Sequence, residues 1–349
     1  MNHFLAERFQ IKGKVTLVEP WGSGHINDTF KVCIDHSLQP SYILQRINTS
    51  VFPDVLKLMD NYQRVTNHLR LKKDERFQVV ELVKTIDGRV WDNSDNGSAW
   101  RMLSYISDSR SFDLAPDAKF SYQAGLAYGW FVKSLSDLPQ PRLHEVIPGF
   151  HSLRLRIEQL MKTITENRTN RLINCKPVVE FFLSRCDEMQ KFDSLINTDI
   201  PLRTTHNDTK INNVLFSSQG KAISVVDLDT VMPGVIHYDF GDAIRTISST
   251  ACEDETDLGK VEINIELYRS FSKGFLSETR SMLTPTELHY LPKSPEIMAF
   301  IMGIRFLADY LRGDTYYKVK HPEHNIQRAQ NQMALISDME KKRELLFLE

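Results

Sequence analysis

The sequence predicts an α+β fold in which a small antiparallel β-sheet lobe is followed by a larger, mainly helical lobe. The first hundred residues contain short runs of β-branched and aromatic residues that are separated by turn residues. From about residue 119 onward, apolar residues recur at helical spacing instead. The 349 residues are enough to build two lobes. We therefore expect a first lobe at residues 1–104 and a second lobe at residues 105–349, joined near Tyr105.

The first lobe is expected to combine strands with one long helix. A helix is predicted after Pro53, because the apolar residues that follow it recur on one helical face. Gly22 and Gly24 lie in the turn between the first two strands, and a polar loop at residues 92–97 joins the last two. The predicted strands span residues 15–18, 29–34, 42–47, 79–83 and 100–106.

The second lobe is expected to be helical around one hairpin. Two short apolar runs, at residues 214–216 and 223–226, flank a turn and are typical of a β-hairpin. The last helix is predicted to have Ser294 as its N-cap, Pro295 at its first position and Gly313 just beyond its end. The predicted helices span residues 122–135, 153–165, 178–192, 258–276 and 295–311.

Composition and charge exclude several classes of protein. The formal net charge of -2 gives no general attraction to nucleic acid or to an anionic membrane. No segment is apolar for the 18 or so residues that span a bilayer, and no leader peptide is visible, so we expect a cytoplasmic protein. The four cysteines include no C-x-x-C pair, which disfavours a zinc site or a disulfide framework. The acidic stretch at residues 252–255 is expected to form a solvated loop.

The strongest chemical signal surrounds the predicted hairpin. Polar residues precede its first strand and follow its second, so we expect Asp208, Asn213 and Asp227 to lie close together. Phosphoryl transfer needs an oriented hydroxyl and a divalent cation that bridges phosphate oxygens. Asp208 is placed to orient the acceptor hydroxyl or accept its proton. Asn213 and Asp227 offer hard oxygen ligands that suit magnesium.

The same residues also allow a simpler interpretation. A His-x-Asp pair in a loop usually reflects turn chemistry, and only the added Asn213 and Asp227 favour catalysis. His206 is expected to be a structural hydrogen-bonding residue, because kinase mechanisms do not require an imidazole base.

The spacing His206-x-Asp208, with Asn213 after it and Asp227 behind a strand, resembles the motif shared by aminoglycoside phosphotransferases, choline kinases and protein kinases. Further stretches are similar to the N-acetylhexosamine 1-kinases of that superfamily: HNDTKINNVL from His206, VDLDTVMPG from Val226, YDFGDAIR from Tyr238 and GIRFLADYLRGD from Gly303. The resemblance covers nearly the whole chain. It implies a protein-kinase-like two-lobed fold, the cofactors ATP and Mg²⁺, and phosphorylation of the anomeric hydroxyl of N-acetylglucosamine or N-acetylgalactosamine in amino-sugar salvage.

The resemblance also implies where the nucleotide binds. Gly22, Gly24 and Thr29 lie where the family has its phosphate-covering loop. Most kinases place a lysine on the third strand, whereas this chain has Arg46, which could hold the phosphates with its planar fork. Tyr105 lies at the connection between the lobes. No glutamate partner for this cation is found on the following helix.

For the acceptor, the resemblance implies contacts from Asp208, Asp242, Arg245, Arg305 and Asp309. Asp239 is expected to brace the catalytic loop. Without the resemblance, Arg305, Asp309 and Arg312 would be interpreted as a solvated helix face with i,i+4 ion pairs.

Two alternatives stay open. The chain could be a kinase of the same fold that acts on choline, an aminoglycoside or another sugar. It could also be a nucleotide-binding module without catalysis. The sequence does not predict an oligomeric state.

Overall fold

The computed structural model describes residues 2–22, 26–37, 39–93 and 97–347. The chain folds into two compact units, each built from more than one stretch of chain. The sheet unit consists of Met1–Ser111, Ser134–Pro148 and Val214–Met232, and the helical unit consists of Phe112–Lys133, Gly149–Asn213 and Pro233–Glu349. The chain first leaves the sheet unit at residues 111 and 112, close to the predicted boundary at residues 104 and 105, and then returns to it twice.

The larger sheet of the sheet unit is antiparallel, with strand order β1-β2-β3-β6-β4 and with β5 also paired to β6. These strands are β1 Val15–Pro20, β2 Asp28–Ile34, β3 Tyr42–Ile47, β4 Leu82–Val83, β5 Asp92–Asn93 and β6 Ala99–Ser104. Across the sheet, Thr29 pairs with Gln45, and Gln45 pairs with Arg101. Because residues directly opposite one another point to the same face, this register places three polar side chains in one row.

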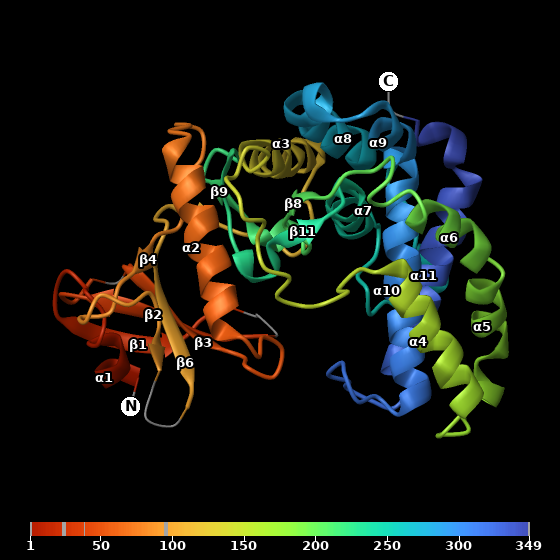
Figure 1. Ribbon diagram of the computed structural model, residues 1–349, viewed down its shortest axis with the longest axis horizontal. Helices are drawn as coiled ribbons and strands as arrows, with labels where there is room; N and C mark the ends of the chain where they lie inside the picture. The colour runs from red at the N-terminus through yellow and green to blue at the C-terminus, as the bar shows by residue number, and fades with distance from the viewer. Residues whose placement is uncertain (1, 23–25, 38, 94–96, 348–349) are drawn as a thin grey trace. The chain divides into compact units, whose positions relative to one another are not determined.

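Apolar side chains of the sheet and of the N-terminal segment form the core of this unit. Val32, Leu44 and Met102 are fully buried in a cluster with Phe9, which follows helix α1 (Asn2–Ala6). Helix α2 (Val55–Leu71) lies along the sheet, as Figure 1 shows, and begins at Asp54, whose side chain accepts a hydrogen bond from the backbone N–H of Lys57. The predicted strands and helix of this region are thus present.

A second, three-stranded sheet completes the unit. Strands β9 (Val214–Ser217) and β10 (Ala222–Val225) form the predicted antiparallel hairpin, which is confirmed, and β7 (Ser109–Arg110) pairs with β9. The backbone N–H of Gln78 donates to the carbonyl of Ile223, which ties the hairpin to the rest of the sheet unit. Asp227 and Asp229, which follow β10, therefore belong to the sheet unit.

The helical unit is organised around one buried helix. Helix α10 packs against α4, α7 and α11, and nearly all of its residues are buried (Figure 1). Gly313 ends it in the left-handed conformation, with φ of 95°, as predicted. The helices of the unit are α3 Ala118–Ser134, α4 Leu153–Glu166, α5 Lys176–Leu183, α6 Cys186–Asp193, α7 Ile236–Ile247, α8 Ile265–Thr279, α9 Pro285–Tyr290, α10 Ser294–Arg312 and α11 His324–Lys341.

Gly241 allows α7 to approach the start of α10 closely. A Cβ atom at this position would lie 2.3 Å from the backbone oxygen of Ser294 and 2.8 Å from Cγ of Met298. A larger residue would therefore push apart the two helices that carry Asp239 and Arg305.

Several predicted helix boundaries are wrong. The helix predicted at residues 178–192 is two helices, α5 and α6, because the chain turns at Ser184 and Arg185. The helix predicted from residue 258 begins instead at Ile265, after Asn264 caps it with its side chain. Helices α7 and α11 were not predicted. The predicted strand at residues 79–83 is reduced to Leu82–Val83.

The predicted N-cap of α10 is also wrong by one position. Ser294 is the first helical residue, and Lys293 before it already has helical torsion angles, with φ of -82° and ψ of -16°. The hydroxyl of Ser294 donates to the carbonyl of Tyr290 instead of capping the helix. A short helical turn at Leu291–Lys293 leads directly into α10, so no extended cap residue is needed.

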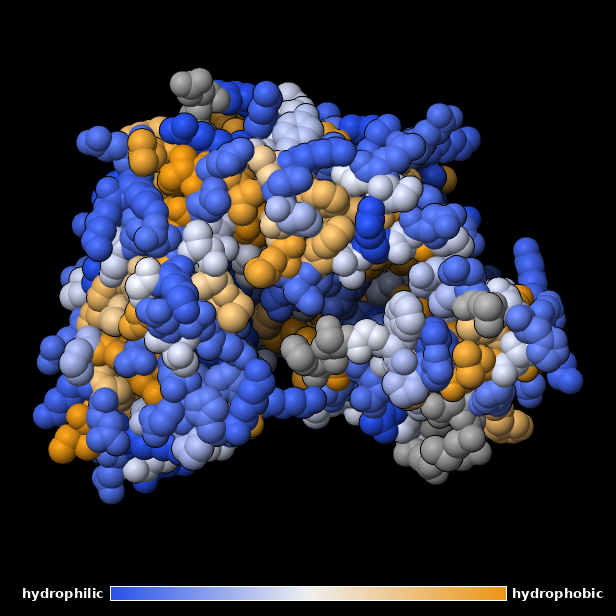
Figure 2. Space-filling view, turned by 180° about the vertical axis from the view of Figure 1, so that it is seen from behind, coloured by the Kyte–Doolittle hydropathy of each residue, from blue (hydrophilic) through white to orange (hydrophobic). Residues whose placement is uncertain are grey.

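Polar residues dominate the molecular face shown in Figure 2, where hydrophobic residues form separate small patches. Within the described residues, none of the helices combines the length and the apolar character that crossing a membrane requires.

Candidate active site

The loop from His206 to Asn213 follows strand β8 (Arg203–Thr205) and is held by Asp239 of α7. The buried Asp239 carboxylate accepts hydrogen bonds from the backbone N–H groups of His206, at 2.8 Å, and Asn207, at 2.7 Å. The hydroxyl of Thr209 donates to the backbone carbonyl of Asp239 at 2.6 Å. The prediction that Asp239 braces this loop is confirmed. Burial raises the pKa of Asp239 to about 7, although the two backbone hydrogen bonds lower it.

His206, the first residue of this loop, is buried and packs against aromatic rings. Its ring makes edge contacts with Tyr128, at a centroid distance of 5.6 Å, and with Phe131, at 5.5 Å. The hydroxyl of Tyr128 donates to the backbone carbonyl of Lys210 at 2.6 Å. Nδ1 of His206 accepts a hydrogen bond from the backbone N–H of Asp208 at 3.3 Å, so the predicted role of His206 as a structural hydrogen-bonding residue is confirmed.

Asp208 lies in the centre of the loop beside a cation and an amide. Its carboxylate forms an ion pair with Nζ of Lys210 at 2.9 Å. The amide nitrogen of Asn213 donates to the backbone carbonyl of Asp208 at 2.9 Å and to its carboxylate at 3.2 Å. Burial alone would raise the pKa of Asp208, but the charge of Lys210 and the hydrogen bonds hold it below its ordinary value. Asp208 is therefore ionised at neutral pH.

Asp242 and Arg245 of α7 pair with each other. Nη2 of Arg245 donates to the carboxylate of Asp242 at 2.8 Å, and Nη1 donates to the carboxylate of Glu253 at 2.6 Å. Burial alone would lower the pKa of Arg245, but these two carboxylates raise it. Both groups lie in the same unit as Asp208, and their predicted contact with the acceptor stays a prediction.

The acidic stretch at residues 252–255 is not the solvated loop that the sequence predicts. Glu253 forms an ion pair with Arg245. The carboxylate of Asp254 lies 2.7 Å from Nε of Arg328 and 3.0 Å from Nε2 of His324. Charged partners on α7 and α11 explain why this run of acids is held against the protein.

In the sheet unit, the residues after β10 are anchored by a buried ion pair. Arg101 of β6 donates two hydrogen bonds to the carboxylate of Asp229, one of them at 2.9 Å from Nη2. The side-chain amide of Asn27 donates to the same carboxylate at 2.6 Å, and the guanidinium also donates to Gln45. The ring of Tyr62 lies 4.6 Å from the guanidinium carbon. Asp229 is thus tied to the sheet two residues beyond Asp227, whose backbone adopts the left-handed conformation with φ of 60°.

The side-chain oxygens of Asn213 and Asp227 are of the kind that magnesium takes as ligands. Because the amide nitrogen of Asn213 donates to Asp208, its oxygen is left to serve as a ligand. Asp227 is exposed in the sheet unit and offers a carboxylate. Among residues 2–22, 26–37, 39–93 and 97–347, no group of three or more His, Cys, Asp or Glu side chains could hold a metal ion. Magnesium commonly keeps several water molecules and takes phosphate oxygens, so an amide and a carboxylate are sufficient protein ligands. The distance between Asn213 and Asp227 stays a prediction.

The predicted nucleotide residues of the sheet unit have different surroundings. Gly22 has a φ of 78°, a conformation that favours glycine, whereas Gly24 lies outside the described residues. The hydroxyl of Thr29 accepts a hydrogen bond from Gln45 at 3.1 Å, and the backbone N–H of Tyr105 donates to the carbonyl of Ser41. Nucleotide contacts at these positions stay a prediction.

Arg46 is not the buried cation of the sheet. Its side chain is 52% exposed and pairs with Asp28 on the neighbouring strand, with Nε at 2.7 Å. The buried cation is Arg101, which lies one strand further along and is 1% exposed. The sequence offered one signal for it, a charged residue in the middle of an otherwise apolar strand.

A comparison of sequences decides the family. The sequence pattern of the family described as "Phosphotransferase enzyme family" matches residues 18–262, more than half of the 349 residues. The chain belongs to the phosphotransferase enzyme family. Both Asp208 and Asp227 fall within the matched part of this phosphotransferase, whereas α10 lies beyond it.

Solved structures of other kinases have a similar fold. An aminopropanol kinase associated with a microcompartment is 15% identical, with a TM-score of 0.61, and the alignment covers 99% of this chain and 98% of that one. The amicoumacin kinase hAmiN, in complex with AMP-PNP and Ca²⁺, is 15% identical, with a TM-score of 0.59 and coverage of 91% and 87%. An ethanolamine kinase of Plasmodium vivax is 14% identical, with a TM-score of 0.54 and coverage of 90% and 82%. The phosphotransferase therefore has the kinase-like fold that the sequence predicts, with a sheet lobe and a helical lobe.

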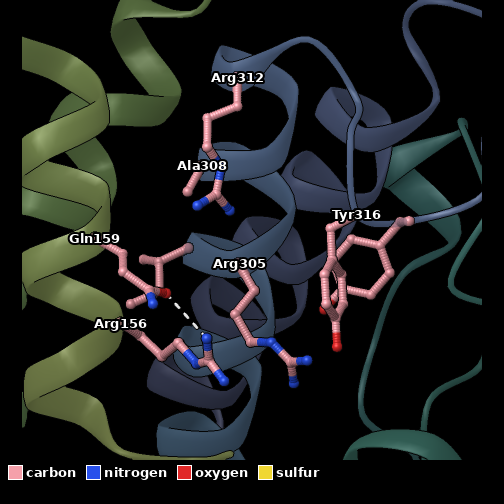
Figure 3. Close-up of a pocket in the computed structure, with 8 residues that line it drawn as sticks. Arg156, Gln159, Arg305, Ala308, Arg312 and Tyr316 are labelled. Carbon is pink, nitrogen blue, oxygen red and sulfur yellow. Dashed lines mark hydrogen bonds between the residues drawn. The ribbon is translucent and has the colours of Figure 1, made fainter. Parts of the chain in front are cut away.

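Arg305 of the phosphotransferase lines a cavity of about 190 Å³ within the helical unit. Figure 3 shows Arg156 and Gln159 of α4 on one side of Arg305 and Tyr316 on the other. Arg312 and Tyr317 also line this cavity. The alternative interpretation of a solvated helix face is wrong for Arg305, which is only 8% exposed, and for the buried Asp309, whereas Arg312 is exposed.

Asp309 holds the segment that follows α10. Its buried carboxylate accepts hydrogen bonds from the backbone N–H groups of Thr315, Tyr316 and Tyr317, at 2.9–3.1 Å. The side-chain amide of Asn325 donates to the same carboxylate at 3.0 Å. These contacts use the carboxylate oxygens within the protein, and direct contact of Asp309 with the acceptor stays a prediction.

Sequence reasoning assigned no role to several residues of these sites. Lys210 lay within the quoted motif, and its spacing from Asp208 was a usable signal. The partners Asp229 and Glu253, and the cavity residues Arg156 and Tyr317, gave no comparable local pattern. They meet their neighbours only because distant segments pack together.

Proposed function

We propose that this phosphotransferase transfers the γ-phosphoryl group of ATP to the anomeric hydroxyl of an N-acetylhexosamine, giving the sugar 1-phosphate. The observation that carries the proposal is the ionised Asp208 carboxylate, which is fixed by Lys210 and Asn213 on a loop that Asp239 braces. N-acetylglucosamine and N-acetylgalactosamine are the proposed acceptors, on the strength of the motifs that begin at His206 and Gly303. Amino-sugar salvage in the cytoplasm is the proposed setting.

Asp208 orients the acceptor in this proposal. An ionised carboxylate accepts a hydrogen bond from the attacking hydroxyl and can take its proton as the new P–O bond forms. The lowered pKa makes Asp208 a weak base, so we assign it mainly the role of positioning the hydroxyl, with proton transfer late in a loose transition state. Lys210 offsets the negative charge of Asp208 close to an anionic phosphoryl group.

The remaining proposed roles concern the nucleotide. We assign the amide oxygen of Asn213 and the carboxylate of Asp227 to magnesium, which would neutralise charge on the β- and γ-phosphate oxygens of ATP. Gly22, Gly24, Thr29, Arg46 and Tyr105 are the proposed nucleotide contacts. Arg101 and Asp229 are not assigned to the nucleotide, because they are buried and paired with each other. They position the chain that carries Asp227.

The charge of the cavity beside α10 disfavours a cationic acceptor. The kinases of similar fold include one named for aminopropanol and one named for ethanolamine. Such amino alcohols carry an ammonium group at neutral pH, as aminoglycosides and choline also carry positive charge. A cavity lined by Arg156, Arg305 and Arg312 would repel these cations. A neutral or acidic acceptor is compatible with it.

An acceptor panel tests the proposal. ATP turnover would be measured with N-acetylglucosamine, N-acetylgalactosamine, choline, ethanolamine and an aminoglycoside, and the product would be identified by ³¹P NMR. We expect turnover with an N-acetylhexosamine and a phosphate bonded at the anomeric position. Turnover only with a cationic acceptor would overturn the substrate assignment. ATP binding without turnover of any acceptor would favour the non-catalytic alternative.

A further inference from the structure

The cavity beside α10 gathers positive charge without a carboxylate to balance it. Arg156, Arg305 and Arg312 line it, together with Tyr316 and Tyr317. In the described part of the chain, no ion pair links any of these arginines to an acidic side chain. Buried arginines are normally paired, so a cluster of this kind needs a separate physical explanation.

Arg305 has hydrogen-bond donors to spare. A guanidinium group carries five N–H donors, and the hydrogen bond found for Arg305 runs from Nη1 to the thioether sulfur of Met302 at 3.3 Å. Aromatic rings surround the group instead. Its central carbon lies 5.0 Å from the centroid of Phe150, 6.0 Å from Tyr316 and 5.7 Å from Tyr317. These rings hold the planar group in place and leave its N–H donors for a ligand.

Arg156 adds a second cation whose partners are neutral. Its guanidinium donates to the backbone carbonyl of Phe150 at 2.8 Å and to the side-chain oxygen of Gln159 at 2.9 Å, the bond drawn in Figure 3. Burial, and then the like charge of Arg305, lower the pKa of Arg156 to about 10. Arg312, on the last turn of α10, is exposed at the rim. An anion in the cavity would relieve the repulsion among these groups.

The hydroxyl of Tyr317 is an independent sign that this cavity binds a ligand. Its hydroxyl is buried and has no hydrogen-bond partner in the described structure. Leaving a buried hydroxyl without a partner is unfavourable, so such groups are often completed by a bound molecule. Burial raises the pKa of Tyr317, which keeps the hydroxyl protonated as a donor. Asp309 fixes this segment through the backbone, so the donor is held in place before any ligand binds.

A series of contacts connects Arg305 of the cavity to the catalytic loop within the helical unit. Phe150, whose ring faces Arg305, also contacts the ring of His151 at a centroid distance of 4.2 Å. Nε2 of His151 donates to the backbone carbonyl of Asn207 at 2.9 Å, and Asn207 directly precedes Asp208. A short series of contacts thus links the cationic cavity to the residue proposed to orient the acceptor hydroxyl.

We propose that this cavity is an anion-binding subsite for the acceptor, and that it takes a carboxylate, phosphate or sulfate substituent of the sugar. The inference rests on the proposed function for the hydroxyl that Asp208 meets. Arg305 and Arg156 provide a planar, charged donor surface, and the Tyr317 hydroxyl provides a neutral donor beside it. The preferred acceptor is therefore an N-acetylhexosamine, or a related sugar, that carries an acidic substituent, and the unsubstituted N-acetylhexosamine does not use this subsite.

Acceptor kinetics test this proposal. Values of kcat/KM would be measured for N-acetylglucosamine, its 6-phosphate, its 6-sulfate and glucuronate. We expect at least one acidic acceptor to exceed the neutral sugar by tenfold or more. In Arg305→Gln the ratio of acidic to neutral kcat/KM should fall at least tenfold, and Arg305→Lys should restore part of it. Arg168→Gln removes an exposed arginine of the same unit and should leave the ratio as in the wild type.

A second variant, at the exposed Arg312, tests the proposal in case Arg305→Gln does not fold. Arg312→Gln changes no contact found within the described residues and should lower the same ratio by about threefold. A wild-type enzyme that uses the acidic sugars no better than the neutral one would overturn the subsite, as would an unchanged ratio in both variants.

Binding of inorganic phosphate and sulfate, measured by calorimetry without nucleotide, separates the possible outcomes. Anion binding that Arg305→Gln abolishes, together with a preference for acidic sugars, supports the proposal. Anion binding without any acidic preference would mean that the cavity takes a free anion, and would overturn the acceptor subsite. If no acceptor is phosphorylated although Arg305-dependent anion binding persists, the proposed function fails while the anion site stands.

Discussion

The sheet unit and the helical unit each bury an arginine, but they surround it differently. Arg101, in the sheet unit, donates to the carboxylate of Asp229 and to the side chain of Gln45, so its charge is fully matched by protein groups. Arg305, in the helical unit, is packed among aromatic rings and donates to a sulfur atom. Both guanidinium groups are buried, but only Arg101 has a carboxylate that balances its charge.

This difference separates a structural arginine from a binding arginine. The buried pair of Arg101 and Asp229 fixes the segment after β10 and leaves no donor set pointing at a ligand. Arg245 also has carboxylate partners, Asp242 and Glu253. Arg305 retains donors beside the unpartnered hydroxyl of Tyr317. The two arrangements predict opposite responses to substitution.

The largest expected effect is on stability in the sheet unit. Asp229→Asn would leave the Arg101 charge buried without a counter-charge, and we expect it to lower the free energy of unfolding by about 3–5 kcal/mol. Urea denaturation would measure the change. Asp28→Asn is the matched control, since it breaks the exposed pair with Arg46. If Asp229→Asn lowers the free energy of unfolding by less than about 1 kcal/mol, the buried pair of Arg101 contributes no more to stability than the exposed pair of Arg46.

The next effect concerns Arg305 and requires an anion. Without anion, Arg305→Gln should change the free energy of unfolding by no more than about 2 kcal/mol, because it removes the contacts of the guanidinium with aromatic rings but no ion pair. Sulfate at about a hundred times its dissociation constant should stabilise the wild type by about 2.7 kcal/mol and leave the variant unchanged. Equal stabilisation of the two proteins would contradict an anion site at Arg305.

His151 reports the charge of the cavity directly. Burial, and then the charge of Arg305, lower its pKa to about 4, with a smaller lowering from Arg156, whereas its bond to Asn207 and the charge of Asp242 raise it. We expect Arg305→Gln, or bound sulfate, to raise this pKa by about one unit, which NMR titration of the imidazole would detect. No shift on either change would contradict a charge contact between Arg305 and His151.

The sign of the associated pH dependence follows from the lowered pKa. His151 is neutral when folded and has an ordinary pKa of about 6.5 when unfolded. Its contribution to stability is therefore present above pH 6.5 and is lost as the pH falls toward 4. Because removal of Arg305 raises the folded pKa, Arg305→Gln should lose less stability than the wild type over this range.

The smallest effect is expected at Arg46. Its pair with Asp28 is exposed on both sides, so Arg46→Gln should alter the free energy of unfolding by less than about 0.5 kcal/mol. If Arg46 holds ATP phosphates as proposed, the KM for ATP should nonetheless rise several-fold. An unchanged KM would remove Arg46 from the nucleotide site.

Local patterns predicted the sheet unit and the hairpin well. Strands β1, β2 and β3 follow runs of β-branched residues between turns, and α2 has apolar residues on one face. Helices α7 and α11 were not predicted, because their sequences lack a regular apolar pattern. Buried polar residues such as Asp239 in α7 and Asn331 in α11 interrupt the apolar periodicity on which the prediction depends.

In the candidate site, too, contacts between residues close in sequence could be predicted, whereas contacts between distant segments could not. Asp208 and Asn213 are five residues apart on one loop, so their proximity is a local property that the sequence could predict. Arg101 and Asp229 are 128 residues apart, and no local rule pairs them. The cationic cavity forms only because α4 packs beside α10 and because Asp309 folds the following segment back. Long-range packing decides which arginine is matched and which is left for a ligand.

The central claim is that Asp208 presents an acceptor hydroxyl to ATP, and ³¹P NMR of the reaction with N-acetylhexosamine tests it most directly. We predict a phosphomonoester signal coupled to the anomeric proton in the wild type, a rate at least about 100-fold lower in Asp208→Asn, and a wild-type rate in the exposed control Asp199→Asn. Undiminished product formation by Asp208→Asn would contradict the account.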